Sequence, residues 1–482
     1  MAGTKLTWHN HTGNQTCHPV AIEGPKSLGD LVGLVAGAEA TGIRAVGAHH
    51  SWSDVALTDG VLVEPDHLGG GIVPDDGTLR PPPPASGPRV RVLAGTHLHQ
   101  LNPVLEAAGL ALPNMGGYDA QTVAGVVSTS THGSGLTFGP FPDMVRSLDM
   151  VIAGGKVVRV EPDEGPTDPD AFAAKYGEER ELVADDDAFY AAVCAMGCMG
   201  IVHSLLIEVR DTFNVEEVRT LSTWEAVRTT LAADLAADHY ELFVDPYERK
   251  GVHELLVTRR TQTDEDPTGM PLDRQLRHPL LELQERFPGT WLVTWLLARY
   301  APGLMAKGFG WVLRRMRDDS FVDVSYRVFN IGEANKIPAY SAELAVSLEN
   351  DAHIAAVERI FAIAAECRDK GLVHTSPIAL RFVAPSKAYA SMMYDRPTMM
   401  IELILAKGTR KGFDLLAFYE DRLADLGIRP HWGQVNSLDA GTDFAAMYPK
   451  WPQWMAAYAR FNATGVFNSP FTDRIGISRP RA

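Results

Sequence analysis

L-P-N-M-G-G-Y-D-A-Q-T-V-A-G-V-V-S-T-S-T-H-G-S-G, from Leu112 to Gly135, combines glycine with serine and threonine hydroxyls over 24 residues. Small residues let a backbone approach a ligand closely, and successive N–H groups with hydroxyls hold anionic oxygens. The stretch has neither the lysine of a P-loop nor a G-x-G-x-x-G that opens a helix after a strand. It therefore indicates either a site for a diphosphate-bearing cofactor or an ordinary glycine- and serine-rich loop.

A second unusual stretch, G-A-H-H-S-W-S-D-V, runs from Gly47 to Val55 and places two histidines after a short apolar run. Neighbouring side chains of an extended chain point to opposite sides, so the pair is poorly arranged to share a metal ion. A catalytic base, a point of cofactor attachment and a hydrogen-bonded loop histidine remain as interpretations. The histidines at positions 9, 11 and 18 have no acidic partner at metal-ligand spacing either, and we expect no metal site.

The two stretches together resemble the aldonolactone and alditol oxidase branch of the vanillyl-alcohol-oxidase flavoproteins. That branch carries G-x-x-H-S early in the chain, L-P-N-M and A-G-x-x-x-T-x-T-H-G-S-G further on, and H-W-G-K near the end. This chain has the corresponding residues in the same order, at Gly47–Ser53, Leu112–Gly135 and His431–Gln434. The resemblance runs over the whole chain.

The resemblance implies an α+β fold, with a PCMH-type FAD-binding domain and an inserted α+β substrate domain built on an antiparallel sheet. We expect the FAD-binding domain at residues 1–210, the substrate domain at 211–415, and a segment at 416–482 that returns to the first domain. A chain of 482 residues is long enough for two or three domains.

The resemblance also implies FAD as the cofactor, bound covalently through the imidazole of His50, the histidine directly before the serine. His49 has no counterpart in the family pattern, and we interpret it as a loop residue with a hydrogen bond nearby. Gly116 would lie beside the flavin and leave room for O₂, which favours an oxidase that releases H₂O₂. The other cofactor contacts implied are Val46, Gly47, Ala48, His49, Ser51, Gly117, Thr122, Gly125, Thr129, Ser130, Thr131, His132, Ile201 and His431.

The substrate side departs from the family pattern at several positions. The strand motif E-x-R keeps its arginine as Arg381 but has Ala379 in place of the glutamate. The His-x-Thr positions of the polyol oxidases are Glu402 and Ile404, and the lysine of H-W-G-K is Gln434. Arg381, Glu402 and Gln434 are the catalytic candidates. Arg381 would stabilise negative charge, and Glu402 would act as general base or simply pair with the arginine.

These replacements change the expected substrate. A polyol site must bond several hydroxyls, since each one left without a partner costs about 1–3 kcal/mol. We therefore expect an FAD-dependent oxidase of an alcohol, sugar lactone or sterol-like compound, with a pocket that favours one oxidisable hydroxyl on an apolar body. The alternatives are a sugar-lactone dehydrogenase with an acceptor other than O₂ and a flavin-binding protein without activity.

The composition restricts the partners. The chain has 44 basic and 60 acidic residues and a net charge of −16, which argues against nucleic acid as a ligand. Four cysteines are too few for a disulfide framework, and the first residues show no signal peptide, so we expect buried free thiols in a cytoplasmic protein. The expected partners are a small alcohol or lactone and O₂.

The most apolar window, residues 291–312, is interrupted by Arg299, Pro302 and Lys307 and is too short and too charged for a spanning helix. We predict a buried pair of helices here. The alternative is an apolar rim that faces a hydrophobic substrate or, as a weaker interpretation, a membrane surface.

Overall fold

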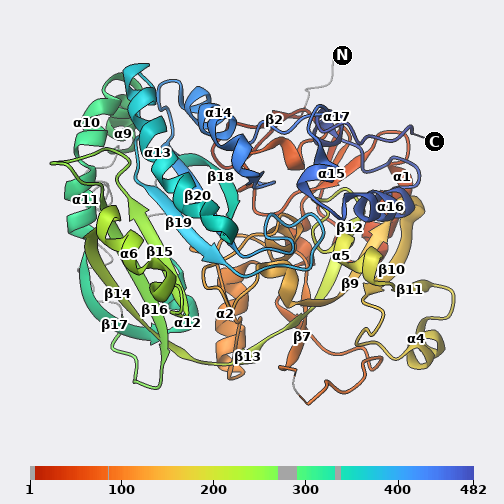
Figure 1. Cartoon of the computed structure of the whole chain (residues 1–482). Coiled ribbons are helices and arrows are strands. Elements are labelled where there is room, and N and C mark those ends of the chain that lie inside the picture. The colour runs from red at the N-terminus through yellow and green to blue at the C-terminus, as the bar shows by residue number, and fades with distance from the viewer. Residues whose placement is uncertain (1–5, 85, 270–289, 332–337, 482) are drawn as a thin grey trace.

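The computed structural model describes residues 6–84, 86–269, 290–331 and 338–481 of the chain. Two large sheets lie side by side, with the N-terminal and C-terminal segments together on one side of the molecule (Figure 1). This mixture of helix and sheet is the α+β class that the sequence predicts.

The chain begins with a short antiparallel pair, β1 and β2, and a small parallel sheet follows that leads into the histidine stretch. Its strands are ordered β3-β5-β4, and a helix connects the first strand to the third. The side chains of Ile43, Leu62 and Val63 are completely buried in it. The elements of this part are β1 (Trp8–His9), β2 (Thr16–Cys17), β3 (Ala21–Glu23), α1 (Leu28–Gly37), β4 (Ile43–Ala45) and β5 (Val61–Val63).

A six-stranded sheet follows, in the order β11-β10-β9-β12-β7-β6. β9 and β10 form an antiparallel hairpin, and Gly154 and Gly155 between them have φ of 77° and 72°. Glycine suits this turn because side chains disfavour positive φ. The strands are β6 (Ile72–Val73), β7 (Arg89–Leu93), β9 (Val145–Ile152), β10 (Lys156–Glu161), β11 (Arg180–Ala184) and β12 (Ile201–Glu208), and the helices are α2 (Leu98–Ala107), α3 (Val123–Ser128), α4 (Pro169–Tyr176) and α5 (Asp186–Ala192).

The eight-stranded sheet is antiparallel throughout, in the order β17-β14-β16-β15-β19-β20-β18-β21. It confirms the antiparallel sheet expected after residue 210. Its strands are β14 (Asn214–Thr223), β15 (His239–Val244), β16 (Glu254–Thr263), β17 (Asp318–Val324), β18 (Ala339–Ser347), β19 (Ile378–Val383), β20 (Thr398–Ala406) and β21 (Arg429–Pro430), and a short pair, β8 (Leu110–Ala111) with β13 (Arg210–Asp211), precedes them.

Alternation along these strands gives the large sheet two different faces. Residues such as Leu242, Leu380 and Ile401 form a core with the helices that cover one face (Figure 1). Successive side chains of a strand point to opposite sides, so Arg381 and Glu402 lie on the other face. The covering helices are α6 (Trp224–Asp234), α13 (Ala352–Asp369) and α14 (Gly412–Leu423), and α12 (Ser325–Phe329) follows β17.

The last part of the chain packs back onto the first sheets. The Trp454 indole donates a hydrogen bond to the carbonyl of Cys194 at 3.1 Å, and the Ile43 amide donates to the carbonyl of Val466 at 2.9 Å. Trp432 is completely buried and stacks on Trp451. The helices here are α15 (Phe444–Met447), α16 (Trp451–Phe461) and α17 (Pro470–Arg474).

The cysteines agree with the sequence prediction. Cys17, Cys194, Cys198 and Cys367 are all buried, and each is a free thiol. They pack as small apolar side chains in the cores of the molecule.

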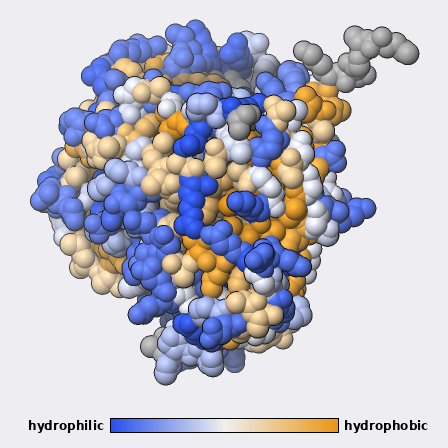
Figure 2. Space-filling view, turned by 90° about the vertical axis from the view of Figure 1, so that its right-hand side faces the viewer, coloured by the Kyte–Doolittle hydropathy of each residue, from blue (hydrophilic) through white to orange (hydrophobic). Residues whose placement is uncertain are grey.

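The prediction of a buried helix pair for the apolar window is wrong. The chain forms three short helices there, α9 (Thr290–Tyr300), α10 (Pro302–Lys307) and α11 (Phe309–Met316), at the left edge of Figure 1. Several of their large apolar side chains, including Leu296 and Trp311, face solvent. Of the helices within the described ranges, none has the length and hydropathy needed to cross a bilayer. The face on the right of Figure 1, away from these helices, mixes hydrophilic and apolar residues (Figure 2).

Candidate functional site

The two glycine-containing stretches meet at Gly47 and Thr122. A Cβ added to Gly47 would lie 2.7 Å from Thr122 Oγ1, and a Cβ added to Gly125 would lie 2.9 Å from the same oxygen. Both distances are shorter than real Cβ contacts, so these positions admit only glycine without local movement. Thr122 Oγ1 accepts a hydrogen bond from the Gly125 amide and caps α3. The backbone of two distant segments is thereby brought close together around the Thr122 hydroxyl, in a cradle that admits few side chains.

His50 lies at the side of this cradle and is half-buried. Its Nε2 is 3.1 Å from the hydroxyl of Tyr118, and its ring centroid is 4.6 Å from those of Tyr118 and His11. Burial, with repulsion from His11, His49 and His97, lowers the pKa of His50 to about 3. The imidazole is therefore neutral at physiological pH. Among the described residues, no group bonds its Nδ1.

His49 is held in a different environment. Its φ is 61°, in the left-handed region, and its Nε2 lies 3.4 Å from Glu64 Oε1. Its carbonyl accepts a hydrogen bond from the His11 amide at 2.8 Å. The two adjacent histidines therefore have separate partners.

The H-W-G-Q motif holds the histidine loop in place from the far end of the chain. The Trp52 amide donates to the carbonyl of Gly433 at 2.7 Å, and Ser53 Oγ donates to the carbonyl of Trp432 at 2.6 Å. The Gly433 amide donates to His431 Nδ1 at 3.0 Å, and burial lowers the pKa of His431 to about 4. His431 is therefore a neutral ring that supports a loop. Within the described parts of the chain, the His431 side chain makes no hydrogen bond to a charged side chain.

The other predicted cofactor contacts differ in how available their side chains are. Ser130 Oγ is buried and donates to Ser391 Oγ at 2.8 Å, whereas the Thr129 and Thr131 hydroxyls lie 3.4 Å apart and are half-buried. Ile201 is buried at the start of β12. The remaining predicted contacts have short side chains or none: Val46, Ala48, Ser51, Gly116 and Gly117.

Gly116 has a packing constraint of its own. A Cβ there would lie 3.1 Å from the carbonyl oxygen of His132, tighter than most real contacts. A glycine at this position therefore keeps space open and also allows the close approach of two backbone segments.

Opposite the glycine-rich stretch, charged side chains cross the large sheet from strand to strand. Arg381 Nε donates to Glu241 Oε1 at 2.7 Å, and Arg381 Nη1 donates to Glu402 Oε2 at 3.3 Å. Arg260 on β16 donates to Glu241 Oε2 at 3.2 Å. The register pairs Ala379 directly with Glu402. The carboxylate missing from the family's E-x-R position is thus replaced by one on the neighbouring strand.

Glu402 has an unusual protonation equilibrium. Burial raises its pKa; attraction to Arg381 opposes this, but repulsion from Glu343 and Glu241 adds to it, and the pKa reaches about 7. Ser341 Oγ donates to Glu402 Oε1 at 3.4 Å. Arg381 stays cationic, because the glutamates around it raise its pKa above the ordinary value despite burial. Glu402 can therefore gain or lose a proton near neutral pH beside a fixed positive charge.

Glu343 is a site residue that sequence reasoning missed. Its Oε1 lies 3.2 Å from His132 Nε2 in a buried ion pair, and its Oε2 accepts a hydrogen bond from Gln434 Nε2 at 3.0 Å. Burial resists its ionisation, but His132 lowers the pKa of Glu343 to about 2. Glu343 faces Glu402 across the β18–β20 pair. The sequence signal that could have identified Glu343 is that it is the single acidic residue within the otherwise largely apolar strand β18.

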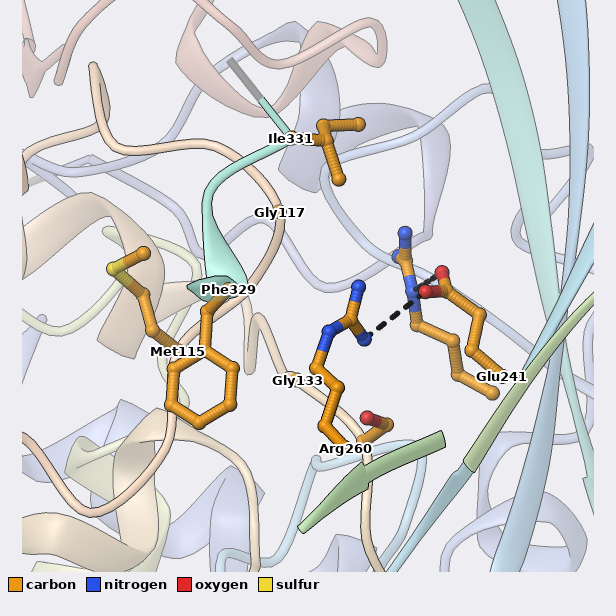
Figure 3. Close-up of a pocket in the computed structure, with 9 residues that line it drawn as sticks. Met115, Gly117, Gly133, Glu241, Arg260, Phe329 and Ile331 are labelled. Carbon is orange, nitrogen blue, oxygen red and sulfur yellow. Dashed lines mark hydrogen bonds and ion pairs between the residues drawn. The ribbon is translucent and has the colours of Figure 1, made fainter. Parts of the chain in front are cut away.

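The two halves of the site enclose a cavity of about 10 Å³, the size of one water molecule (Figure 3). Met115 and the glycines line one side of it, and the pair of Arg260 and Glu241 lies on the other. Its full lining is Met115, Gly117, Gly133, Ser134, Glu241, Arg260, Phe329, Ile331 and Arg381. The arrangement places Arg381, which is bonded to the titratable carboxylate of Glu402, against the glycine-rich stretch.

Comparisons with known proteins agree with this geometry. An FAD binding domain matches residues 19–161, which include the whole of the histidine stretch and of the glycine-rich stretch. The fold and site define an FAD-dependent oxidoreductase that acts on CH–OH groups, and FAD is its cofactor. The D-arabinono-1,4-lactone oxidase family matches residues 206–475, more than half of the chain. The chain belongs to this family, as the motifs predict.

Relatives cover nearly the whole chain. It is 27% identical over 478 residues to L-gulono-1,4-lactone dehydrogenase of Mycobacterium tuberculosis, with 97% of this chain and 98% of the relative covered. It is 24% identical over 492 aligned positions to a long-chain alcohol oxidase of an uncultured marine euryarchaeote, with 95% of each covered. The crystal structure of cholesterol oxidase from B. sterolicum has the same fold, with a TM-score of 0.75, 15% identity, and 98% and 97% of the two chains covered.

Proposed function

We propose that this protein is an oxidase of a largely apolar alcohol, with FAD bound covalently through His50. The observation that carries the proposal is the pairing of Arg381 with a titratable carboxylate, Glu402, opposite the glycine-rich stretch. When bound, FAD accepts a hydride from the hydroxyl-bearing carbon and passes the electrons to O₂ with release of H₂O₂.

The state of His50 supports the covalent link. A neutral imidazole with a free ring nitrogen is a nucleophile, whereas a protonated one is not. Its Nε2 is engaged by Tyr118, so Nδ1 is the atom we assign to the bond. The pKa of about 3 keeps the ring in the reactive form at any physiological pH.

Glu402 is the proposed base. A carboxylate with a pKa near 7 accepts the hydroxyl proton readily at neutral pH, because the best catalytic pKa lies near the working pH. Arg381 lies within hydrogen-bond distance of Glu402 and would stabilise the negative charge that the cofactor gains when it accepts the hydride from the substrate. Gln434 positions Glu343, its hydrogen-bond partner, and so acts indirectly.

Three positions support an apolar alcohol over a polyol. Ala379 and Ile404 offer no hydrogen bond to a hydroxyl, and Gln434 already uses its amide on Glu343 and accepts from Ser341. A substrate with many hydroxyls would leave some of them without partners. The name of the euryarchaeal relative, long-chain alcohol oxidase, is consistent with this choice.

Anaerobic mixing with different substrate classes tests the proposal. We expect a long-chain alcohol or a sterol to bleach the flavin absorbance, and a polyol or an aldonolactone to do so more slowly. Faster bleaching by a lactone would favour the sugar-lactone dehydrogenase alternative, especially if a dye acceptor supports turnover and air does not. Bleaching by none of the four would favour a flavin-binding protein without activity.

A substitution at Gly116 tests whether O₂ is the electron acceptor that reaches the reduced cofactor beside this residue. Gly116→Ala is expected to lower the rate of reoxidation by O₂ by about tenfold, equivalent to about 1.4 kcal/mol in the barrier, because the methyl group fills space beside the cofactor. Stopped-flow reoxidation in air-saturated buffer measures it. Turnover with a dye acceptor is the control and should change little. Equal loss with both acceptors would show that the alanine disturbs the contact with the His132 carbonyl and that the glycine has no special part in O₂ access.

A further inference from the structure

Helix α9 turns its large apolar side chains toward solvent and its small ones toward the protein, the reverse of a usual amphipathic helix. Thr294 and Ala298 are buried, whereas the larger apolar residues Leu292, Leu296 and Tyr300 face solvent. The buried face packs on the loop after β20: the Arg410 amide donates to the carbonyl of Ala298 at 3.2 Å. A helix that only stabilised the fold would bury its large apolar side chains and expose the small and polar ones.

The exposed apolar side chains of α9 and of the elements near it are together called the α9 patch. Seven of the ten exposed large hydrophobic side chains of the described residues are on α9, α10, α11 and the start of α14, with 42–72% of their surface accessible. Single exposed apolar residues are common, but such a concentration on neighbouring elements marks an interaction surface. The α9 patch consists of Leu292, Val293, Leu296, Tyr300, Leu304, Trp311 and Phe413.

The charge around the α9 patch has a sign opposite to that of the whole protein. Residues 290–317 and 403–413 contain eight lysines and arginines and no aspartate or glutamate, in a chain with net charge −16. Exposed cations next to the apolar side chains are Arg299, Lys307, Lys407, Arg410 and Lys411. The first acids after these two segments are Asp318 and Asp414, and Glu254 pairs with Arg314 from β16.

We propose that the α9 patch binds the surface of an anionic phospholipid bilayer, with α9 lying in the plane of the interface. Apolar and aromatic side chains enter the boundary between headgroups and acyl chains, and the cations bind lipid phosphates. Tyr300 and Trp311 suit this position, because their amphipathic rings favour the membrane interface. A second copy of the chain fits less well, since a symmetric dimer through this face would oppose two sets of eight cations.

Vesicle sedimentation with the full-length, FAD-loaded protein tests the proposal. We expect binding to vesicles of phosphatidylcholine with phosphatidylglycerol, no binding to phosphatidylcholine alone, and release by added salt. Leu296→Glu and Trp311→Glu should each lower the partition coefficient by about tenfold or more, because each puts a charge where apolar surface is buried. Val104→Glu is the matched control, since Val104 is 45% exposed on α2, outside the α9 patch.

Three results would overturn the proposal. The wild-type protein could remain in the supernatant with anionic vesicles, or Val104→Glu could weaken binding as much as Leu296→Glu. Light scattering could also show a dimer that Leu296→Glu disperses while vesicles bind neither form, which would assign the α9 patch to contact between copies. Because binding is measured without substrate, these outcomes do not depend on the proposed oxidase activity.

Discussion

Replacing Arg381 with alanine is expected to slow reduction of the flavin by substrate about 10²–10³-fold, as loss of a preorganised charge at the reacting centre does in other enzymes. The guanidinium lies between Glu241 and Glu402 and is the cation in contact with the proposed base. Anaerobic stopped-flow absorbance in a single turnover measures the effect. Near-normal reduction would remove Arg381 from the chemistry.

The Arg381→Ala change also leaves Glu241 with Arg260 as its remaining partner, and removing one member of a buried ion pair costs about 3–5 kcal/mol of stability. Arg381→Ala combined with Glu241→Gln removes that charge and should fold while remaining slow. Arg260→Ala is the matched control, because Arg260 bonds the same Glu241 but not Glu402. If Arg260→Ala slowed reduction as much as Arg381→Ala, the effect would come from the buried ion-pair network as a whole.

Glu402→Gln is expected to reduce the rate of flavin reduction by about 10²–10⁴-fold, the usual contribution of a positioned general base. In the wild type, the rate should rise with pH through about 7 and then level off, since only the ionised carboxylate accepts a proton. In Glu402→Gln this rise should disappear. A wild-type rate that is flat between pH 5 and 9 would contradict the role of Glu402, because an order-of-magnitude change is expected across each pH unit below the pKa.

The Glu343→Gln variant tests whether Glu402 acts as the base or is only a structural carboxylate. Repulsion from Glu343 contributes to the high pKa of Glu402, and this repulsion exceeds the opposite effect of His132. Removal of the Glu343 charge should therefore shift the inflection of the pH profile to lower pH while the plateau rate changes much less. An unchanged inflection would show that the titrating group is not Glu402.

The cofactor region could be predicted because its signals are local. Glycines that admit close backbone approach, such as Gly47 and Gly125, leave a trace in the sequence whatever surrounds them. The Gly-Gly hairpin of β9 and β10 and the aromatic helix α16 have equally local signals in the sequence.

The substrate side depended on strand pairing, which the sequence alone does not reveal. Glu402 was a candidate by its position in the motif, but its register opposite Ala379 and its proximity to Glu343 arise only when β18, β19 and β20 align. The sequence favoured burial of α9 over its exposure for a related reason. Apolar content shows that a segment avoids water, yet it does not distinguish burial in a core from burial against another surface.

The covalent link at His50 is the central claim, and mass spectrometry of the denatured, proteolysed protein tests it most directly. The account predicts that the peptide containing His50 carries the added mass of FAD, that the acid-precipitated protein stays yellow, and that His50→Ala releases all of its flavin. His49→Ala should keep the yellow colour, because His49 interacts with Glu64 and the two rings have separate partners. Free flavin in the supernatant of the wild-type protein, with an unmodified His50 peptide, would contradict the account.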